Sequence, residues 1–125
     1  MLFRSGKILL IDDEESILTT LERALKASGY QVVALRDGIT ALELFEKMHN
    51  DFDLVITDLT MPGMTGLDLS RKITNIRSDI PIILCTGFSD VIDRDKVRSI
   101  GIRELLLKPA GIRDLKDTIR RALEN

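Results

Sequence analysis

Several charged and hydroxyl side chains of this sequence directly follow short apolar runs. This placement is typical of side chains that bind a ligand or take part in a reaction at the ends of strands. Asp12 and Asp13 come directly after one such run, Asp58 after a second, Thr86 after a third and Lys108 after a fourth. Three carboxylates in one crevice repel each other by an amount on the order of several kcal/mol unless a cation lies between them. Oxygen ligands with no histidine or cysteine nearby favour Mg²⁺ over zinc. We therefore predict a magnesium site at the three aspartates.

A metal ion, an ammonium group and a hydroxyl around one carboxylate can stabilise a phosphoryl group that moves onto that carboxylate. Asp58 is the predicted nucleophile, Lys108 supplies the ammonium group and Thr86 the hydroxyl. The simpler interpretation is that Asp58 only caps the turn of residues 60–66, which contain one proline and two glycines. The elements that position the other candidate residues decide between the two interpretations.

Predicted strands and helices alternate along the chain. Apolar runs predict strands at residues 7–11, 31–35, 54–57, 82–85 and 103–107, and helical spacing predicts helices at residues 17–25, 41–48, 67–76, 91–100 and 112–123. This alternation predicts an α/β fold: a five-stranded parallel sheet with five helices on both faces. Because parallel strands share their carboxyl ends, all candidate residues should lie at one edge of the sheet. That shared edge favours a chemical role for Asp58 over turn capping.

Length and composition restrict the domain organisation and the function class. A chain of 125 residues with 44% hydrophobic residues is sufficient for a single domain, expected to span residues 1–125. The formal net charge is -2 and no basic run marks a nucleic-acid surface, so direct binding of nucleic acid is not expected. The lone Cys85 favours a reducing compartment, and the short N-terminal apolar run predicts no membrane span. We expect a cytoplasmic location.

Taken together, the motifs are similar to those of receiver domains of the response-regulator family of two-component systems, over essentially the whole chain. The residues that carry the resemblance are Asp12 and Asp13, then Asp58, Met61, Pro62, Gly63 and Gly66, then Thr86 and Gly87, and finally Lys108 and Pro109. The resemblance implies a flavodoxin-like sheet with strand order 2-1-3-4-5. It also implies a phosphoprotein of signal transduction: a module in a phosphorelay that catalyses only its own phosphorylation and dephosphorylation, and not an enzyme in the usual sense.

The resemblance assigns roles to the acidic residues. Asp13 and Asp58 would bind Mg²⁺ together with the backbone carbonyl of Thr60, while Asp12 would act close by or through a water molecule. Asp58 would accept the phosphoryl group from a phosphohistidine, so the implied partner is a sensor histidine kinase or a histidine phosphotransfer domain. The oligomeric state is left open, with a dimer through the fourth helix, fifth strand and fifth helix as one alternative.

Roles also follow for the residues after the fourth and fifth strands. Lys108 would contact one phosphoryl oxygen, and Thr86 would turn inward to contact another once the group is bound. The Lys108–Pro109 peptide bond is expected to be cis, as in the family; a proline permits this geometry.

Some positions differ from the family pattern. Leu105 stands three residues before the lysine, where many members carry Tyr or Phe, so a conformational change there must use aliphatic packing or be small. Thr60 and Phe88 offer neither an acid nor an amide that could align water. We therefore expect a long-lived phosphoryl group or onward relay. The segment 85–89 is also similar to receivers attached to hybrid sensor histidine kinases.

The nearest enzyme alternative is a Mg²⁺-dependent phosphatase that forms an aspartyl-phosphate intermediate. It uses a similar residue set, but the segment that begins at Asp58 lacks a second acid two residues on, and the domain is too small for a cap. A nucleotide-binding module is not supported, because neither glycine-rich phosphate loop occurs.

Several other residues have simple structural interpretations. His49 is expected at the end of the second helix, near the sheet edge opposite to the aspartates, and is interpreted as a surface imidazole, not as a phosphorylated histidine. Cys85 is interpreted as a small buried hydrophobic residue. Met61 and Met64 are expected to pack the loop after the third strand onto the domain.

Overall fold

The computed structural model describes residues 6–87 and 90–124. Five strands form one sheet in the order β2-β1-β3-β4-β5, and every neighbouring pair is parallel. They are β1 (Lys7–Ile11), β2 (Gln31–Leu35), β3 (Leu54–Asp58), β4 (Ile82–Thr86) and β5 (Glu104–Leu107). The predicted fold class and strand order are confirmed.

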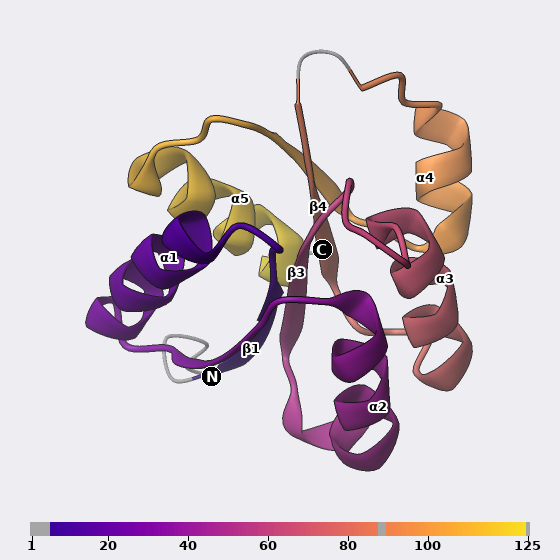
Figure 1. The fold of residues 1–125 in the computed structure, drawn as a ribbon, viewed down its shortest axis with the longest axis horizontal. Helices are drawn as coiled ribbons and strands as arrows, with labels where there is room; N and C mark the ends of the chain where they lie inside the picture. Colours follow the sequence, from indigo (N-terminus) through magenta and orange to yellow (C-terminus); the bar gives the residue numbers. More distant parts are fainter. Residues whose placement is uncertain (1–5, 88–89, 125) are drawn as a thin grey trace.

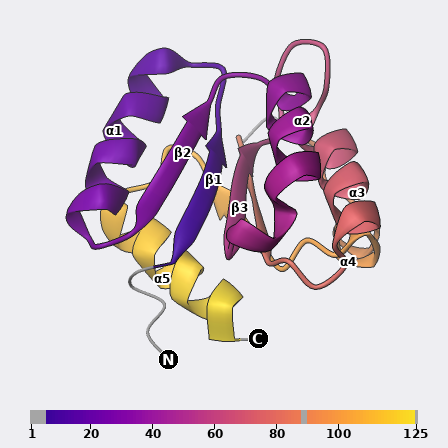
Figure 2. The same ribbon diagram turned by 90° about the horizontal axis from the view of Figure 1, so that it is seen from below.

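Helices cover both faces of the sheet and give the domain three layers (Figure 1). They are α1 (Glu15–Ala27), α2 (Gly38–Met48), α3 (Gly66–Ile76), α4 (Arg94–Ile100) and α5 (Ile112–Glu124), with the short 3₁₀ helix η2 (His49–Asp51) after α2. Figures 1 and 2 show α1 and α5 on one face and α2, α3 and α4 on the other. Among the described residues, no helix is both long and apolar enough to cross a membrane.

Alternation along the strands divides the apolar core into two halves. Ile8 and Leu10 of β1 belong to the half beneath α1 and α5, whereas Leu9 and Ile11 belong to the half beneath α2, α3 and α4. All five residues of β3 are buried. A strand buried on both faces is firmly held, so Asp58 at its end stands on a rigid support.

The start of α4 differs from the sequence prediction, which placed residues 91 and 92 in the helix. The helix begins at Arg94 because the side chain of Asp93 caps it, accepting hydrogen bonds from the backbone N–H groups of Asp95 and Lys96. Val91 lies outside the helix and is 98% exposed. Apolar spacing therefore extended the predicted helix past its cap.

Candidate functional site

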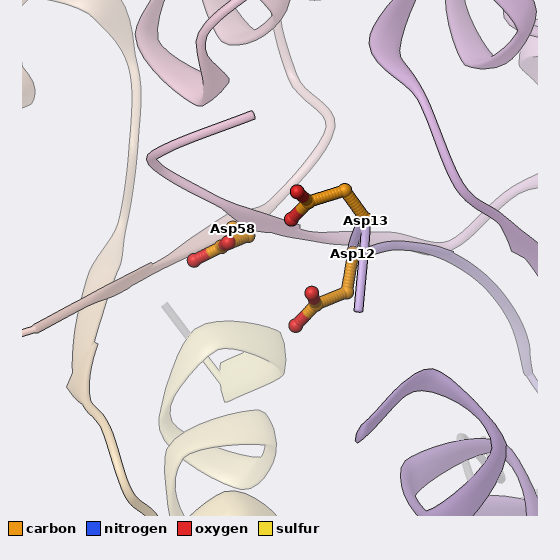
Figure 3. Close-up of side chains that lie close together, drawn as sticks. All are labelled: Asp12, Asp13 and Asp58. Carbon is orange, nitrogen blue, oxygen red and sulfur yellow. The ribbon is translucent and has the colours of Figure 1, made fainter. Parts of the chain in front are cut away.

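The side chains of Asp12, Asp13 and Asp58 gather at the carboxyl end of the sheet (Figure 3). Each offers one carboxylate oxygen such that all three oxygens lie within 4.8 Å of one another. Their proximity follows from the strand order: β1 and β3 are neighbours and Ile11 is paired with Thr57, so the residues after Ile11 lie beside Asp58. The structure brings together the three aspartates that the sequence selected.

Lys108 reaches this cluster from the end of β5. Its Nζ atom lies 3.2 Å from Asp58 Oδ1 and 3.5 Å from Asp12 Oδ2. Its backbone N–H donates to the carbonyl of Thr86 at 2.7 Å, which holds the lysine at the end of β4. The Lys108–Pro109 peptide bond is cis, as expected.

Burial and charge act in opposite directions at this cluster. Asp58 is 8% exposed and Asp12 is 4% exposed. Burial raises the pKa of the Asp58 carboxyl; Lys108 opposes that rise, and the charges of Asp12 and Asp13 add to it. Burial disfavours the charged form of Lys108, but Asp12 and Asp58 outweigh this effect and raise the pKa of the lysine. One ammonium group therefore does not neutralise the three carboxylates, and this oxygen-rich donor set fits a divalent cation such as Mg²⁺.

A hollow of about 340 Å³ lies over the cluster, and we call it the acidic hollow. Its lining residues are Asp13, Glu14, Asp58, Thr60, Gly87, Asp90 and Lys108. Thr60, a predicted metal ligand through its carbonyl, thus lies at the same hollow as Asp13 and Asp58. Asp58 therefore borders open space next to the contact with Lys108.

Thr86, the last residue of β4, is buried and lines a different, neighbouring hollow of about 560 Å³. We call this the α4–β5 hollow, because its other lining residues include Val97 and Leu105. Gly87, the next residue in the chain, lines both hollows, whereas Thr86 lines only the α4–β5 hollow. Leu105 lines the same hollow and pairs in register with Leu84, two residues before Thr86.

Three residues at the acidic hollow were not among the predicted site residues: Glu14, Gly87 as a hydrogen-bond donor, and Asp90. The backbone N–H of Gly87 donates to Asp90 Oδ2 at 2.7 Å, and the N–H of Asp90 donates to the carbonyl of Gly87 at 3.2 Å. Glu14 extends the acidic run that begins at Asp12, a signal that the sequence contained. For Asp90, the only indication in the sequence was an acidic residue four positions after Thr86. Phe88, which entered the prediction on phosphoryl lifetime, lies outside the described residues.

The loop after Asp58 is packed tightly onto the domain. The backbone N–H of Gly66 donates to the carbonyl of Leu59 at 2.8 Å, and a Cβ atom at Gly66 would lie 2.2 Å from the Asp58 carbonyl oxygen. Met61 is buried, and Met64 would lie 3.2 Å from a Cβ atom at Gly38, the first residue of α2. The expectation that both methionines pack this loop is confirmed.

Cys85 lies closer to the aspartates than the sequence indicated. It pairs in register with Asp58, so the expectation that no cysteine lies near the carboxylates is wrong. The thiol is nevertheless unsuited to metal binding at neutral pH, because burial, together with the charge of Asp58, raises the pKa of Cys85 to about 12. Its interpretation as a buried hydrophobic residue is confirmed.

His49 begins η2, at the end of the domain where β3 starts. Its backbone carbonyl accepts a hydrogen bond from Arg77 Nη1 at 2.7 Å. The predicted position, opposite to the aspartates, is confirmed, but the interpretation as a surface imidazole is wrong: Nδ1 is buried without a hydrogen-bond partner among the described residues, and the ring centroid lies 6.2 Å from that of Phe45. The imidazole takes no part in the acidic hollow.

Comparison with known proteins gives consistent results. The response regulator receiver domain family matches residues 8–120. A protein named "Probable transcriptional regulator ycf27" from Porphyridium aerugineum is 39% identical over 117 residues, which are 94% of this chain and 48% of the relative. The chain therefore spans about half the length of this curated relative.

Solved structures agree in fold as well as in sequence. A response regulator receiver domain protein from Clostridium thermocellum superposes with a TM-score of 0.89 at 34% identity, covering 95% of this chain and 94% of that one. The signal receiver domain of a signal transduction histidine kinase from Syntrophus aciditrophicus superposes with a TM-score of 0.82 at 30% identity, covering 96% and 91%. With its five-stranded parallel sheet and its aspartate cluster, the chain belongs to the response regulator receiver domain family.

Proposed function

We propose that this chain is a phosphoacceptor switch that takes a phosphoryl group from a phosphohistidine onto Asp58 in a Mg²⁺-dependent reaction. The observation that carries the proposal is the contact of Lys108 Nζ with Asp58 Oδ1 at 3.2 Å, beside two further carboxylates at the mouth of a hollow. In the transfer, an Asp58 oxygen attacks phosphorus, the new P–O bond replaces the P–N bond, and the imidazole of the donor leaves. The donor would be a sensor histidine kinase or a histidine phosphotransfer domain.

The donor set of the site supports a bound divalent cation. Receiver domains bind Mg²⁺ at an acidic pocket, and here Asp12, Asp13 and Asp58 could hold such an ion. The predicted ligands are Asp13, Asp58 and the carbonyl of Thr60, with Asp12 close by. When bound, Mg²⁺ would offset the negative charge that a phosphoryl group brings to three carboxylates.

Lys108 and Thr86 have separate proposed tasks. Lys108 already contacts Asp58, so its ammonium group would exchange this contact for one with a phosphoryl oxygen as charge develops there. Thr86 is buried at the end of β4 and would turn from the α4–β5 hollow toward the phosphoryl group. The turn would alter the packing next to Leu105, which couples the site to α4 and β5.

The setting of the chain is part of the proposal. Relatives about twice its length are named transcriptional regulators, and a structurally similar domain belongs to a histidine kinase. We propose a cytoplasmic receiver that signals by conformational change or passes the phosphoryl group onward. A dimer through α4, β5 and α5 stays a prediction.

The direct test is intact-mass detection of a phosphoryl adduct after addition of a small acyl phosphate, with and without Mg²⁺. We expect one adduct of wild type that needs Mg²⁺ and is lost in Asp58→Asn. Asp51→Asn, an exposed aspartate of η2, is the matched control and should label like wild type. A missing adduct in wild type contradicts the proposal for small donors, and repeated release of phosphate would instead support the phosphatase alternative.

The decay of the adduct then measures the phosphoryl lifetime. The expectation of a long lifetime rests on the neutral side chains of Thr60 and Phe88. Asp90 lines the same hollow and adds an acid that this expectation did not include.

A further inference from the structure

Asp90 brings an additional carboxylate into the acidic hollow, outside the aspartate cluster. It lines the hollow together with Asp13, Glu14 and Asp58, against the single ammonium group of Lys108 among the described residues. The carboxylate is fixed by the short hydrogen bond from the N–H of Gly87, 2.7 Å from Oδ2. Hydrogen bonds to an ionised acceptor are about twice as strong as neutral ones, so this contact occupies the Gly87 amide firmly.

A phosphoryl group on Asp58 would disturb this contact in two ways. It carries a charge of about -1.5 to -2 near neutral pH, so it would repel the Asp90 carboxylate across the hollow. It also presents oxygen acceptors in a space where the Gly87 amide is a donor. One N–H group makes one strong hydrogen bond, and therefore the carboxylate and the phosphoryl oxygen compete for it.

The surroundings of Asp90 offer a place for the displaced carboxylate. Asp90 and Gly87 line both the acidic hollow and the α4–β5 hollow. The α4–β5 hollow is also lined by Arg94 and Arg98 of α4, whose guanidinium groups attract a carboxylate. A short movement of Asp90 thus exchanges a negatively charged space for one with cationic side chains.

We propose that Asp90 is a positioning residue: it holds the Gly87 amide in the unphosphorylated protein and yields this donor to the phosphoryl group on Asp58. This inference rests on the proposed function. Because the Gly87–Asp90 contact must break first, Asp90 opposes phosphorylation. When Asp90 is released, it moves toward Arg94 and Arg98 and thereby links phosphorylation of Asp58 to α4. This link needs no aromatic side chain at position 105, where this chain has leucine.

The first test measures the contact itself and needs no phosphorylation. In the unphosphorylated protein, the amide proton of Gly87 should resonate downfield in NMR spectra because it is bonded to a carboxylate. Asp90→Asn should move it upfield and Asp90→Ala further, with faster hydrogen exchange in both. An unchanged Gly87 amide in Asp90→Ala would overturn the inference.

The second test measures the rate of Mg²⁺-dependent labelling by a small acyl phosphate. Since a hydrogen bond to a charged group contributes a net factor of about ten or more in an equilibrium, we expect Asp90→Ala to be labelled about ten times faster than wild type. Asp90→Asn keeps an oxygen acceptor without charge and should fall between the two.

Two further variants separate the hydrogen bond from charge alone. Glu14→Gln removes a carboxylate from the same hollow and should accelerate labelling less than Asp90→Ala. Asp95→Asn removes a charge at an exposed position of α4, and this variant should be labelled like wild type. Equal acceleration in Glu14→Gln and Asp90→Ala would overturn the inference.

The decay of the adduct distinguishes the remaining alternatives. Unchanged labelling with slower loss of the phosphoryl group in Asp90→Ala would overturn the inference, because Asp90 would then align water. Slower labelling would also overturn it, since the contact between Gly87 and Asp90 would then favour phosphorylation. If wild type takes no label at all, the proposed function fails, and so does the proposed displacement of Asp90 by a phosphoryl group. The chemical shift of the Gly87 amide still tests the contact between Gly87 and Asp90 in that case.

Discussion

Lys108 Nζ contacts Asp58 Oδ1 at 3.2 Å, although the strands that end beside them are separated by β4 in the sheet. The lysine side chain thus spans the end of β4 and places its charge among carboxylates from two other strands. Because Asp12 and Asp58 are buried, Lys108 is the counter-ion that makes the metal-free site tolerable. The same contact sets the lysine where charge would develop during phosphoryl transfer.

Replacement of Lys108 by methionine tests this double role. Lys108→Met keeps most of the apolar stem but leaves Asp12 and Asp58 without their cation. We expect the free energy of unfolding to fall by about 1–2 kcal/mol without Mg²⁺, a value reduced for the partial exposure of the lysine, and labelling to slow at least about tenfold. Urea unfolding and intact mass measure the two effects. Lys96→Met on exposed α4 is the control, and equal effects of the two variants would refute the assignment.

Neutralising Asp58 should stabilise the metal-free domain. Burial raises the pKa of the Asp58 carboxyl in the folded protein above its ordinary value. The folded state therefore binds the proton more tightly than the unfolded state, and stability is lost as the pH rises from the unfolded pKa through the folded pKa. At neutral pH, Asp58→Asn avoids this cost and should raise the free energy of unfolding, by an amount that solvent screening of the site keeps small.

The pH dependence provides the check on Asp58→Asn. Unfolding midpoints in urea, measured with a chelator present, should show the gain at neutral pH and its disappearance when the pH falls below the unfolded pKa. Asp51→Asn, at an exposed position of η2, should show no gain. A gain for Asp58→Asn that is the same at acidic and neutral pH would contradict the assignment to the carboxyl charge.

Bound Mg²⁺ should stabilise the fold through Asp13. A ligand at ten times its dissociation constant adds about 1.4 kcal/mol to the free energy of unfolding, so Mg²⁺ should raise the thermal midpoint of wild type. Asp13→Asn removes one of the three carboxylates of the cluster without touching the contacts of Lys108. Its midpoint, followed by circular dichroism, should respond much less to Mg²⁺. An equal response in both proteins would place the ion elsewhere.

Much of the fold and of the site could be predicted because buried strands consist of short, continuous apolar runs that are visible in the sequence. β3 is buried along its whole length and therefore reads as an apolar run, and the parallel sheet then places Asp58 and Asp12 at one edge. Lys108 could be placed at the same edge for the same reason. The roles of these residues in phosphoryl transfer stay predictions.

Other features depend on contacts between segments, which sequence periodicity does not contain. Cys85 could be placed opposite Asp58 only once the register of β3 and β4 was known. Asp90 lines the acidic hollow and accepts a hydrogen bond from the N–H of Gly87, and no apolar pattern in the sequence marks that contact. The start of α4 is set by the cap at Asp93, which competes with the apolar spacing of the residues before it.

Gly66 should be indispensable for the packing beneath Asp58. A Cβ atom there would lie 2.2 Å from the Asp58 carbonyl oxygen and 2.8 Å from Leu84 Cδ1, and the backbone atom cannot move aside cheaply. We expect Gly66→Ala to lower the free energy of unfolding by about 3 kcal/mol. Gly111→Ala is the matched control, since nothing lies within 4 Å of a Cβ atom at that position. Similar urea midpoints for the two variants would contradict the close approach.

The α4–β5 hollow should accept an aromatic ring at position 105. Leu105 borders a space of about 560 Å³, so Leu105→Tyr should change the free energy of unfolding by less than about 1 kcal/mol. The same change at the neighbouring Leu106, which is 8% exposed and packs in the core half beneath α1 and α5, should cost about 1–3 kcal/mol. Urea unfolding compares the two variants directly, and equal losses would mean that the hollow does not admit the ring.

The same variant can report on the proposed switch. The chain has one tyrosine, Tyr30, and no tryptophan, so Leu105→Tyr in a Tyr30→Phe background carries a single tyrosine, at the hollow that Thr86 also lines. If Thr86 turns toward a phosphoryl group, the surroundings of this ring change, and we expect the intensity of its emission to change on labelling in the presence of Mg²⁺. The triple variant that also contains Asp58→Asn should show no change in intensity. Emission that stays constant while intact mass shows full labelling would mean that phosphorylation does not reach the α4–β5 hollow.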